Sequence, residues 1–357
     1  MSLNKSCANR NVNLDLLRVL SMLLIILLHS IDHSGVLEAG SDLFFIRFEY
    51  MLVQVCVNCY VMLSGYFLVT SRFRISKLVQ LWMETVFYAL TIKAIFMAAG
   101  AVPFSALSLI SCLFPFLTGR YWFVTIYVGM YLLSPFLDIA IRAMDKKTHA
   151  MLNVLLGILF SVWSSIWPTI AGMNSGGGWG LAWFVVLYFA AAWLRLYYTP
   201  TGKWLWQLLV WIGLSAAVAG VYCKGAGISS FIQTITGNWY KYNSLPAYII
   251  TIALFTGFMN VSIRGCRFAG IISTLAASTF GVYLIHAHAN LSPWIWEKLN
   301  MPGLMKQPGF VLKQIGIVLG IFLICTGIDF LRKKTIGKIE HIALLDQLDA
   351  KIASLRN

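Results

Sequence analysis

The sequence predicts an all-α integral membrane protein, a bundle of about ten transmembrane helices with both termini in the cytoplasm. Hydrophobic residues make up 59% of the chain, charged residues only 11%, and the mean hydropathy is +0.77. Soluble domains carry about 25% charged residues, so this composition excludes a soluble globular fold. The apolar segments are too long and too uniformly apolar for the alternating strands of a membrane barrel.

Ten segments of about 20 apolar residues follow one another along the chain, each long enough to cross a bilayer as a helix. Because repeated spans pack into one bundle, we expect residues 1–335 to form a single transmembrane domain. No short apolar region with a small-residue cleavage site opens the chain, so we expect the first span to be retained. The segments lie near residues 14–33, 46–69, 77–98, 120–141, 149–167, 179–198, 204–222, 244–261, 270–290 and 310–331.

Lysine and arginine are unevenly distributed between the loops. With a cytoplasmic N-terminus, seventeen of them fall on the cytoplasmic side before the C-terminal tail, against seven on the outer side. This positive-inside bias, with an even number of spans, places both termini in the cytoplasm. It also accounts for the net charge of +14 without a nucleic-acid partner. The seven outer residues are Arg47, Arg120, Lys224, Lys241, Lys298, Lys306 and Lys313.

Three segments outside the spans have recognisable patterns. Pro103–Thr118 is apolar but interrupted by prolines, which predicts a re-entrant or interfacial segment on the outer side. Asn174–Trp179 is rich in glycine and predicts a flexible outer loop. Apolar residues at 3–4–3 spacing in 336–357 predict a short cytoplasmic amphipathic tail helix.

The first span carries two ionisable residues, Arg18 and His29, inside the apolar stretch Asn13–Gly35. Their separation of eleven residues returns a helix to within about 20° of its starting direction. Both side chains therefore lie on one helix face, roughly 16 Å apart along the axis. Ionisable groups in such a run are costly, and they indicate a functional site by default. We predict that this polar line faces a cavity.

His29 is the first candidate for chemistry, because imidazole titrates near neutrality and serves as a general base or a nucleophile. Asp32 and His33 follow one turn later, and a carboxylate there is placed to orient the imidazole. The alternatives are that His29 is a hydrogen-bonded interfacial histidine and that Asp32 belongs to the outer loop. Two histidines are too few to argue for zinc, so no metal is predicted.

Arg18 is the second candidate, because a guanidinium forks onto phosphate or carboxylate groups. The alternative is a simple pair with Asp15, three residues earlier. Arg72, Arg74 and Lys77 crowd the next cytoplasmic loop. They either join Arg18 in an anion site or serve only as topology signals.

Four motifs in one order resemble the membrane-bound acyltransferase 3 family. They are the Arg-x10-His element from Arg18 to His29, the pattern Tyr60–Tyr66, the segment Tyr121–Pro135 and the pattern Gly281–His286. The family consists of multi-pass O-acyltransferases that modify glycans and other extracytoplasmic acceptors. The resemblance covers nearly the whole chain, which is similar overall to capsule, O-antigen and exopolysaccharide O-acetyltransferases.

The resemblance implies a donor, an acceptor and a location. The donor is cytoplasmic acetyl-CoA, and the acceptor is a hydroxyl of a cell-surface or lipid-linked glycan. The location is the bacterial inner membrane, in contact with its lipids. His29 is the implied essential histidine, and Arg18 the implied donor-holding residue. The chain has fewer basic residues after the second span than many relatives, and a short tail where some carry a fused esterase-like domain. We therefore expect a stand-alone enzyme that completes the transfer itself.

The same resemblance gives the polar line a physical interpretation. Arg18, Arg72, Arg74 and Lys77 would hold the coenzyme A phosphates, and His29 would meet the acetyl group about three turns outward. Direct proton removal by the histidine and an acetyl-histidine intermediate both stay open. The developing oxyanion also needs a hydrogen-bond donor. Substrate or oxyanion candidates are Asn58, Ser64, Trp122, Tyr283 and His286.

Other classes of membrane protein predict different patterns. A transporter or flippase of a glycan or small anionic metabolite is the main alternative, and it predicts an inverted repeat with paired broken helices. We find neither in the sequence. A glycan polymerase would carry large outer loops with several arginines. A non-catalytic sensor would keep its ligand affinity without His29.

Overall fold

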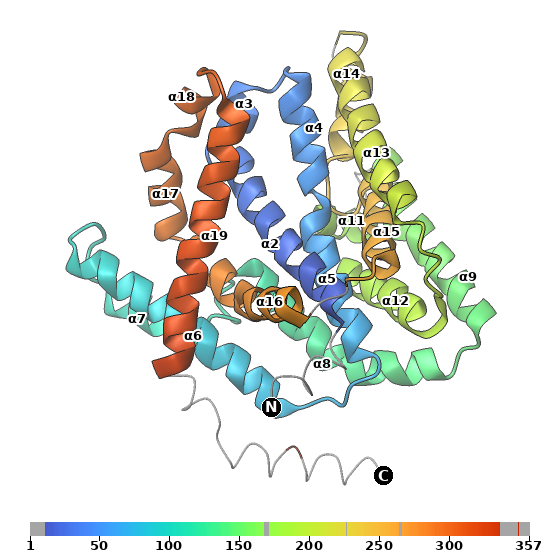
Figure 1. Cartoon of the computed structure of the whole chain (residues 1–357), viewed down its shortest axis with the longest axis horizontal. Coiled ribbons are helices and arrows are strands. Elements are labelled where there is room, and N and C mark those ends of the chain that lie inside the picture. The colour runs from blue at the N-terminus through green and yellow to red at the C-terminus, as the bar shows by residue number, and fades with distance from the viewer. Residues whose placement is uncertain (1–10, 168–170, 226, 264–265, 336–348, 350–357) are drawn as a thin grey trace.

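The computed structural model describes residues 11–167, 171–225, 227–263, 266–335 and Asp349. The described chain is helical throughout and contains no strand (Figure 1). Helices occupy all ten predicted segments, which confirms the all-α fold class. Eight helical segments have the length and composition of membrane spans, whereas α12 (Leu181–Tyr197) and α15 (Leu245–Asn260) are shorter apolar helices. The count of ten spans and the cytoplasmic termini stay predictions.

Helix α2 (Val12–Asp32) lies in the middle of the bundle (Figure 1). It packs against α5 (Val55–Leu68), α16 (Cys266–His286) and α19 (Phe310–Thr335). Its leucines are buried on several sides because neighbours surround the helix, as expected for a helix that is apolar around most of its circumference. The helix with the Arg-x10-His element is therefore the structural centre of the molecule.

The second predicted span consists of two helices, α4 (Phe44–Val53) and α5, which are separated at Gln54. Helix α5 packs closely on α12 at Gly65. A Cβ atom at Gly65 would lie 3.1 Å from Tyr188 Cα, so the absence of a side chain allows the two backbones to approach. This contact places the Tyr60–Tyr66 motif in the core.

The segment between α6 (Ile75–Ala98) and α8 (Trp122–Arg142) contains the short helix α7 (Ala106–Leu113). Its apolar side chains remain exposed, with Leu107 77% accessible. Arg120 links the end of the segment to α7, because its Nη2 donates a hydrogen bond to Ser108 O at 2.9 Å. These exposed apolar side chains fit the interfacial segment predicted for 103–118, and its place in a membrane stays a prediction.

The glycine-rich stretch at the end of α11 (Ala171–Gly178) is packed against the bundle. Ser175, Gly176 and Gly177 have left-handed backbone conformations, which turn the chain sharply. A Cβ atom at Gly178 would lie 2.7 Å from Tyr242 Cβ. The flexibility predicted for this loop stays a prediction. The glycines allow the tight turn and the close approach of the loop to Tyr242.

The remaining helices connect or cover these elements. The predicted tail helix lies outside the described residues except for Asp349. That carboxylate accepts hydrogen bonds from the backbone N–H of Ile75 at 2.6 Å and from the Ser76 hydroxyl, at the start of α6. The other helical elements are α3 (Val36–Ala39), α9 (Lys146–Gly157), η1 (Ile158–Val162), α10 (Trp163–Ile166), α13 (Trp204–Gly225), α14 (Ser230–Asn238), α17 (Leu291–Leu299) and α18 (Met301–Met305).

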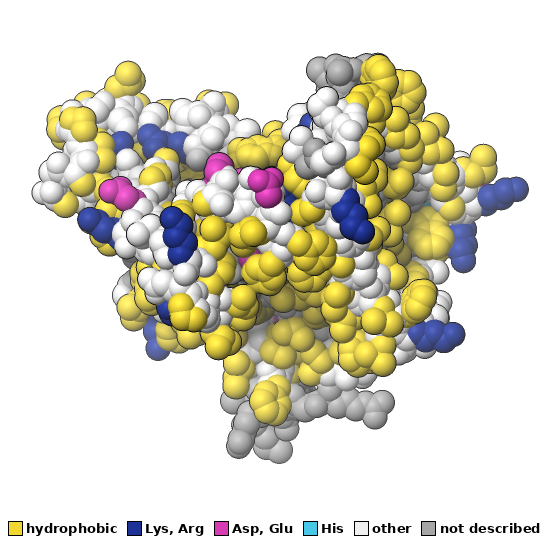
Figure 2. Space-filling view, turned by 90° about the horizontal axis from the view of Figure 1, so that it is seen from above, with side chains coloured by type: hydrophobic (Ala, Val, Ile, Leu, Met, Phe, Trp, Pro, Cys, Tyr) yellow, Lys and Arg dark blue, Asp and Glu magenta, His cyan; other side chains and the backbone are white. Residues whose placement is uncertain are grey.

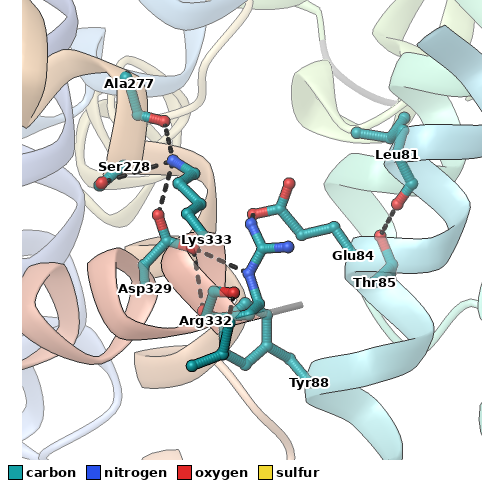
Figure 3. A network of polar contacts seen from close by, with 10 residues as sticks. Leu81, Glu84, Thr85, Tyr88, Ala277, Ser278, Asp329, Arg332 and Lys333 are labelled. Atoms are coloured by element: carbon teal, nitrogen blue, oxygen red, sulfur yellow. Dashed lines mark hydrogen bonds and ion pairs between the residues drawn. The ribbon is translucent and has the colours of Figure 1, made fainter. Parts of the chain in front are cut away.

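A buried ion-pair network fixes α16 between α6 and α19 (Figure 3). Arg332 of α19 contacts Glu84 of α6 at 2.9 Å and Asp329 at 3.2 Å. Lys333 pairs with Asp329 at 2.7 Å and also donates to Ala277 O of α16 at 2.6 Å. Two acidic and two basic groups balance one another, which a buried network requires. Glu84 thus pairs with a residue on another helix.

Candidate active site

A cavity of about 270 Å³ lies beside the last three turns of α2. Helices α5, α8 and α16 and the loops at Trp179 and Tyr242 complete its wall. Most of the lining is apolar or aromatic, and its histidine and carboxylate side chains are His29, Asp32 and His33. The full lining is Met22, Ile25, Leu28, His29, Asp32, His33, Val57, Tyr60, Trp122, Phe123, Trp179, Tyr242, Phe280 and Tyr283.

His29 lies in the last turn of α2, where its carbonyl accepts the backbone N–H of His33 at 3.0 Å. Its ring stacks on His33, with centroids 4.3 Å apart and planes 13° from parallel. On another side it meets His286, with centroids 5.1 Å apart and planes inclined by 43°. Its Nδ1 is buried without a hydrogen-bond partner in the structure.

Asp32 contacts His33, with Asp32 Oδ2 3.9 Å from His33 Nε2. The described contacts include no ion pair or hydrogen bond from Asp32 to His29. The structure therefore does not place Asp32 as the group that orients His29, although Asp32 lines the cavity. Burial lowers the pKa of His33 more than the nearby Asp32 carboxylate raises it.

Aromatic rings from separate segments form the wall opposite His29. Trp122 at the start of α8 stacks on Trp179, with centroids 4.5 Å apart and planes 21° from parallel. Tyr242 lies 6.3 Å from Trp122 and continues the stack. Flat aromatic faces of this kind bury apolar surface and keep their geometry in a packed site. Trp122 thus lines the cavity, and its contact with a substrate stays a prediction.

Asn58 is fully buried and lies outside the cavity. Its Nδ2 donates to Tyr242 O at 2.7 Å and to Thr251 Oγ1 at 3.2 Å, and its Oδ1 accepts from Trp183 Nε1 at 3.0 Å. With both amide hydrogens occupied, Asn58 has no donor left for an oxyanion. Its contribution is to hold the Tyr242 loop against α5.

The other oxyanion candidates differ in their access to the cavity. Ser64 is not in the lining, and its hydroxyl donates to Tyr60 O one turn earlier at 3.2 Å. Tyr283 lines the cavity, with its ring 5.8 Å from Phe123. His286 lies behind His29, fully buried. Of these three, Tyr283 alone belongs to the lining.

Arg18 lies one turn below Met22, the deepest α2 residue of the lining. Its NH1 contacts Asp15 Oδ1 at 3.1 Å, and the other oxygen of that carboxylate accepts from the Ser273 hydroxyl at 2.8 Å. The guanidinium also lies over the Phe67 ring, 5.9 Å from its centroid. The predicted pairing with Asp15 is therefore present, while the Arg18 side chain keeps 27% of its surface exposed.

The basic loop after α5 is near the end of the bundle at which α2 begins. Arg72 and Arg74 are exposed, and Lys77 is half-buried in the first turn of α6. The Tyr131 hydroxyl donates to Arg74 O at 2.9 Å and accepts from its N–H at 3.1 Å, which fixes the loop backbone. None of these three basic residues belongs to the cavity lining.

Figure 2 looks onto the opposite end of the bundle, where α2 finishes. Two patches of acidic side chains lie near the middle of this face, and basic side chains lie on both sides of them. Asp32 and Glu38 are the carboxylates nearest the end of α2 in the chain. The two ends of α2 thus differ in charge, basic near Arg18 and acidic near His29.

Sequence reasoning missed several cavity residues, among them Tyr242 and Phe280. Phe280 lies three residues before Tyr283 on α16, so helical spacing from the Gly281–His286 motif was an available signal. Tyr242 belongs to an irregular loop, for which no periodic pattern exists. Among the described residues, no group of three or more histidine, cysteine or acidic side chains has the geometry of a metal site.

Comparison with known proteins agrees with this arrangement. The model of an acyltransferase domain family matches residues 11–329, from the start of α2 to the ion-pair network in α19. No curated protein and no solved structure matches the chain. The matched region contains every residue of the cavity and both ends of the Arg18–His29 helix. The chain therefore belongs to the acyltransferase 3 family and is a multi-pass membrane protein.

Proposed function

We propose that the protein is a membrane O-acyltransferase that moves an acetyl group from cytoplasmic acetyl-CoA to a glycan hydroxyl. The acceptor is a cell-surface or lipid-linked glycan of the capsule, O-antigen or exopolysaccharide type, in the bacterial inner membrane. The observation that carries the proposal is the position of His29. It lies in an aromatic cavity at one end of a helix whose other end holds Arg18 near a basic loop.

In this proposal His29 is the general base. Its ring removes the proton of the acceptor hydroxyl while the oxygen attacks the thioester carbon. The carbon–sulfur bond breaks, and the coenzyme A thiolate takes the proton from His29. Tyr283, in the same cavity wall, is the candidate donor to the oxyanion. Transfer through an acetyl-histidine keeps the same residues and adds one step.

The cavity suits one sugar unit and the acetyl end of the donor. Its volume of about 270 Å³ lies just below the range of about 300–1,000 Å³ for sites that enclose drug-sized ligands. The stacked rings of Trp122 and Trp179 present flat faces to a sugar ring. Asp32 offers carboxylate oxygens to neighbouring hydroxyls.

The donor fits the basic end of the same helix. Coenzyme A carries phosphates at one end of a thin chain and the thioester at the other. Arg18, Arg72, Arg74 and Lys77 supply the positive charge for the phosphates. Met22 and Ile25 line the cavity one and two turns from Arg18 along α2, and they offer apolar surface to the thioester end.

The test is ester-linked acetate on the surface polysaccharide of a host that expresses the protein. Wild type, His29→Gln and Arg18→Ala would be compared at equal membrane levels, with mild alkali to release the acetate. We expect ester acetate with wild type, none with His29→Gln and a strong reduction with Arg18→Ala. His149→Gln is the matched control, because His149 is buried elsewhere and contacts Phe189 O at 3.0 Å.

If no ester acetate is found, either the proposed function is wrong or the host lacks the acceptor. Hydrolysis of labelled acetyl-CoA by purified membranes distinguishes these two explanations. If ester acetate and hydrolysis are both no greater than in the empty host, the protein is not an acetyltransferase. Equal ester acetate in wild type and His29→Gln would remove His29 from the mechanism. Movement of an unmodified glycan across the membrane, with no ester formed, would support the transporter alternative.

A further inference from the structure

His286 is a buried histidine for which the mechanism above has no role. It is the last residue of α16 and has no exposed surface. Its Nδ1 lies 2.6 Å from Val282 O, one turn earlier in the same helix. A carbonyl oxygen only accepts hydrogen bonds, so Nδ1 carries the hydrogen. With no carboxylate in contact, the buried ring is neutral, because an unpaired buried charge is costly. Its Nε2 is therefore a bare acceptor.

Two ring nitrogens without partners belong to neighbouring histidines. His286 Nε2 and His29 Nδ1 are both buried, and neither has a hydrogen-bond partner in the structure. The ring centroids are 5.1 Å apart. A nitrogen–nitrogen hydrogen bond of about 3 Å between two imidazoles corresponds to a centroid separation of about 5 Å. The centroid separation thus matches that of a hydrogen-bonded imidazole pair.

The other neighbours of His29 do not fit this role. His33 lies face to face with His29, 13° from parallel, and stacked rings do not hydrogen-bond through nitrogens in their planes. Asp32 pairs with His33. His286 meets His29 at an inclined angle and offers an acceptor of known tautomer.

We infer that His286 accepts a hydrogen bond from His29 Nδ1–H and thereby holds His29 in the tautomer whose Nε2 lone pair is free. A base needs that lone pair, and in triad enzymes a carboxylate on Nδ1 secures it. Here a neutral imidazole takes the place of the carboxylate. His286 is thus a positioning residue. The effect of His286 on the rate of transfer rests on the proposed function. The hydrogen bond between His286 and His29 does not depend on that function.

The position of His286 is itself fixed by α16. The network in Figure 3 anchors α16 at Ala277 through Lys333. One turn later, Gly281 lies against Asp329, where any side chain would collide. His286 follows five residues after that contact. The α16–α19 junction therefore sets where the acceptor nitrogen meets His29.

The direct test is the tautomer of His29. The protein, labelled with ¹⁵N-histidine and held in detergent micelles, has six histidines, so each ring can be assigned by single substitution. We expect ¹H–¹⁵N spectra to place the hydrogen on Nδ1 in both His29 and His286. In His286→Ala, the His29 hydrogen should move towards Nε2, the form preferred by free imidazole side chains. A wild-type His29 with its hydrogen on Nε2, or no change in His286→Ala, would overturn the inference.

The kinetic test uses acetyl-CoA turnover in purified membranes. His286→Ala should lower kcat by about 10- to 100-fold, as loss of a supporting hydrogen bond does elsewhere, with KM for acetyl-CoA little changed. His286→Gln, whose amide oxygen replaces the acceptor, should recover most of kcat. His149→Ala is the matched control and should keep wild-type kcat. Full kcat in His286→Ala would contradict the positioning role. Absence of turnover in wild type would instead refute the proposed function. The tautomer measurement would still show whether the hydrogen bond between His29 and His286 exists.

Discussion

At the scale of single residues, the site depends on how His29 is surrounded. Two histidines contact its ring, one through its face and one at an inclined angle. The stacking contact with His33 affects the protonation of His29. The inclined contact with His286 affects the tautomer of His29. Asp32 acts on His33 and reaches His29 only through it. Each contact predicts a different experimental signature.

The pH dependence of turnover should report His33. Burial lowers its pKa from the ordinary 6.5, so His33 is neutral at pH 7 and gains its proton only below pH 6.5. A protonated His33 places positive charge against the His29 ring and opposes proton uptake by the base. We expect turnover to fall as pH decreases below 6.5, and less steeply in His33→Gln because one titrating group is gone.

Initial rates between pH 4.5 and about 8 at saturating donor would test this. Protein extracted after each assay should show an unchanged melting temperature, so that unfolding does not mimic the acid limb. Superimposable profiles for wild type and His33→Gln would contradict the prediction.

The stacked tryptophans should affect the acceptor and not the donor. Trp122→Ala removes a ring that lies 4.5 Å from Trp179, a contact of a kind that contributes about 0.5–1.5 kcal/mol. We expect the acceptor KM to rise by up to about tenfold, since 1.4 kcal/mol is a factor of ten. Acetyl-CoA hydrolysis without acceptor should stay near wild type. Trp206→Ala is the control, because Trp206 is 68% exposed and does not line the cavity.

At the scale of elements, the junction of α16 and α19 positions the cavity wall. Helix α16 contributes Phe280 and Tyr283 to the cavity and His286 behind it. Helix α19 contributes none of the lining, yet its charged last turns hold α16 through Asp329 and Lys333. The packing of these helices allows no side chain at Gly281.

Gly281→Ala should therefore destabilise the protein and impair catalysis. The added Cβ would lie 2.9 Å from Asp329 Cβ and collide with the carboxylate, so one helix must move. Overpacking of this kind costs about 1–3 kcal/mol, and the displaced Asp329 adds to it. We expect a lower melting temperature in detergent and reduced turnover.

Gly270→Ala gives a matched control in the same helix, because a Cβ there would meet nothing within 4 Å. Since alanine favours helix over glycine by about 1 kcal/mol, its melting temperature should stay equal or rise. Equal stability of Gly281→Ala and wild type would show that the α16–α19 contact is not close.

At the scale of the whole molecule, α2 separates a basic end from an acidic end. The positive-inside bias predicts that the basic loop 69–74 faces the cytoplasm and that the turn at Gly35 faces outward. A fluorescent protein fused to the C-terminus should therefore fluoresce, and alkaline phosphatase inserted after Gly35 should be active. Phosphatase inserted after Ser71 should be inactive. The reverse pattern would place His29 on the cytoplasmic side and refute a glycan acceptor outside.

The sequence alone determined the all-α fold class and the apolar segments in which helices form. These follow from composition and from helical periodicity, which act over short distances along the chain. The tertiary structure decided the partners. His286, 257 positions away in the chain, lies beside His29. Asp32 contacts His33, and the Asn58 amide donates to the backbone of the Tyr242 loop. Such contacts depend on how helices cross and how irregular loops fold back, and neither leaves a periodic signal in the sequence.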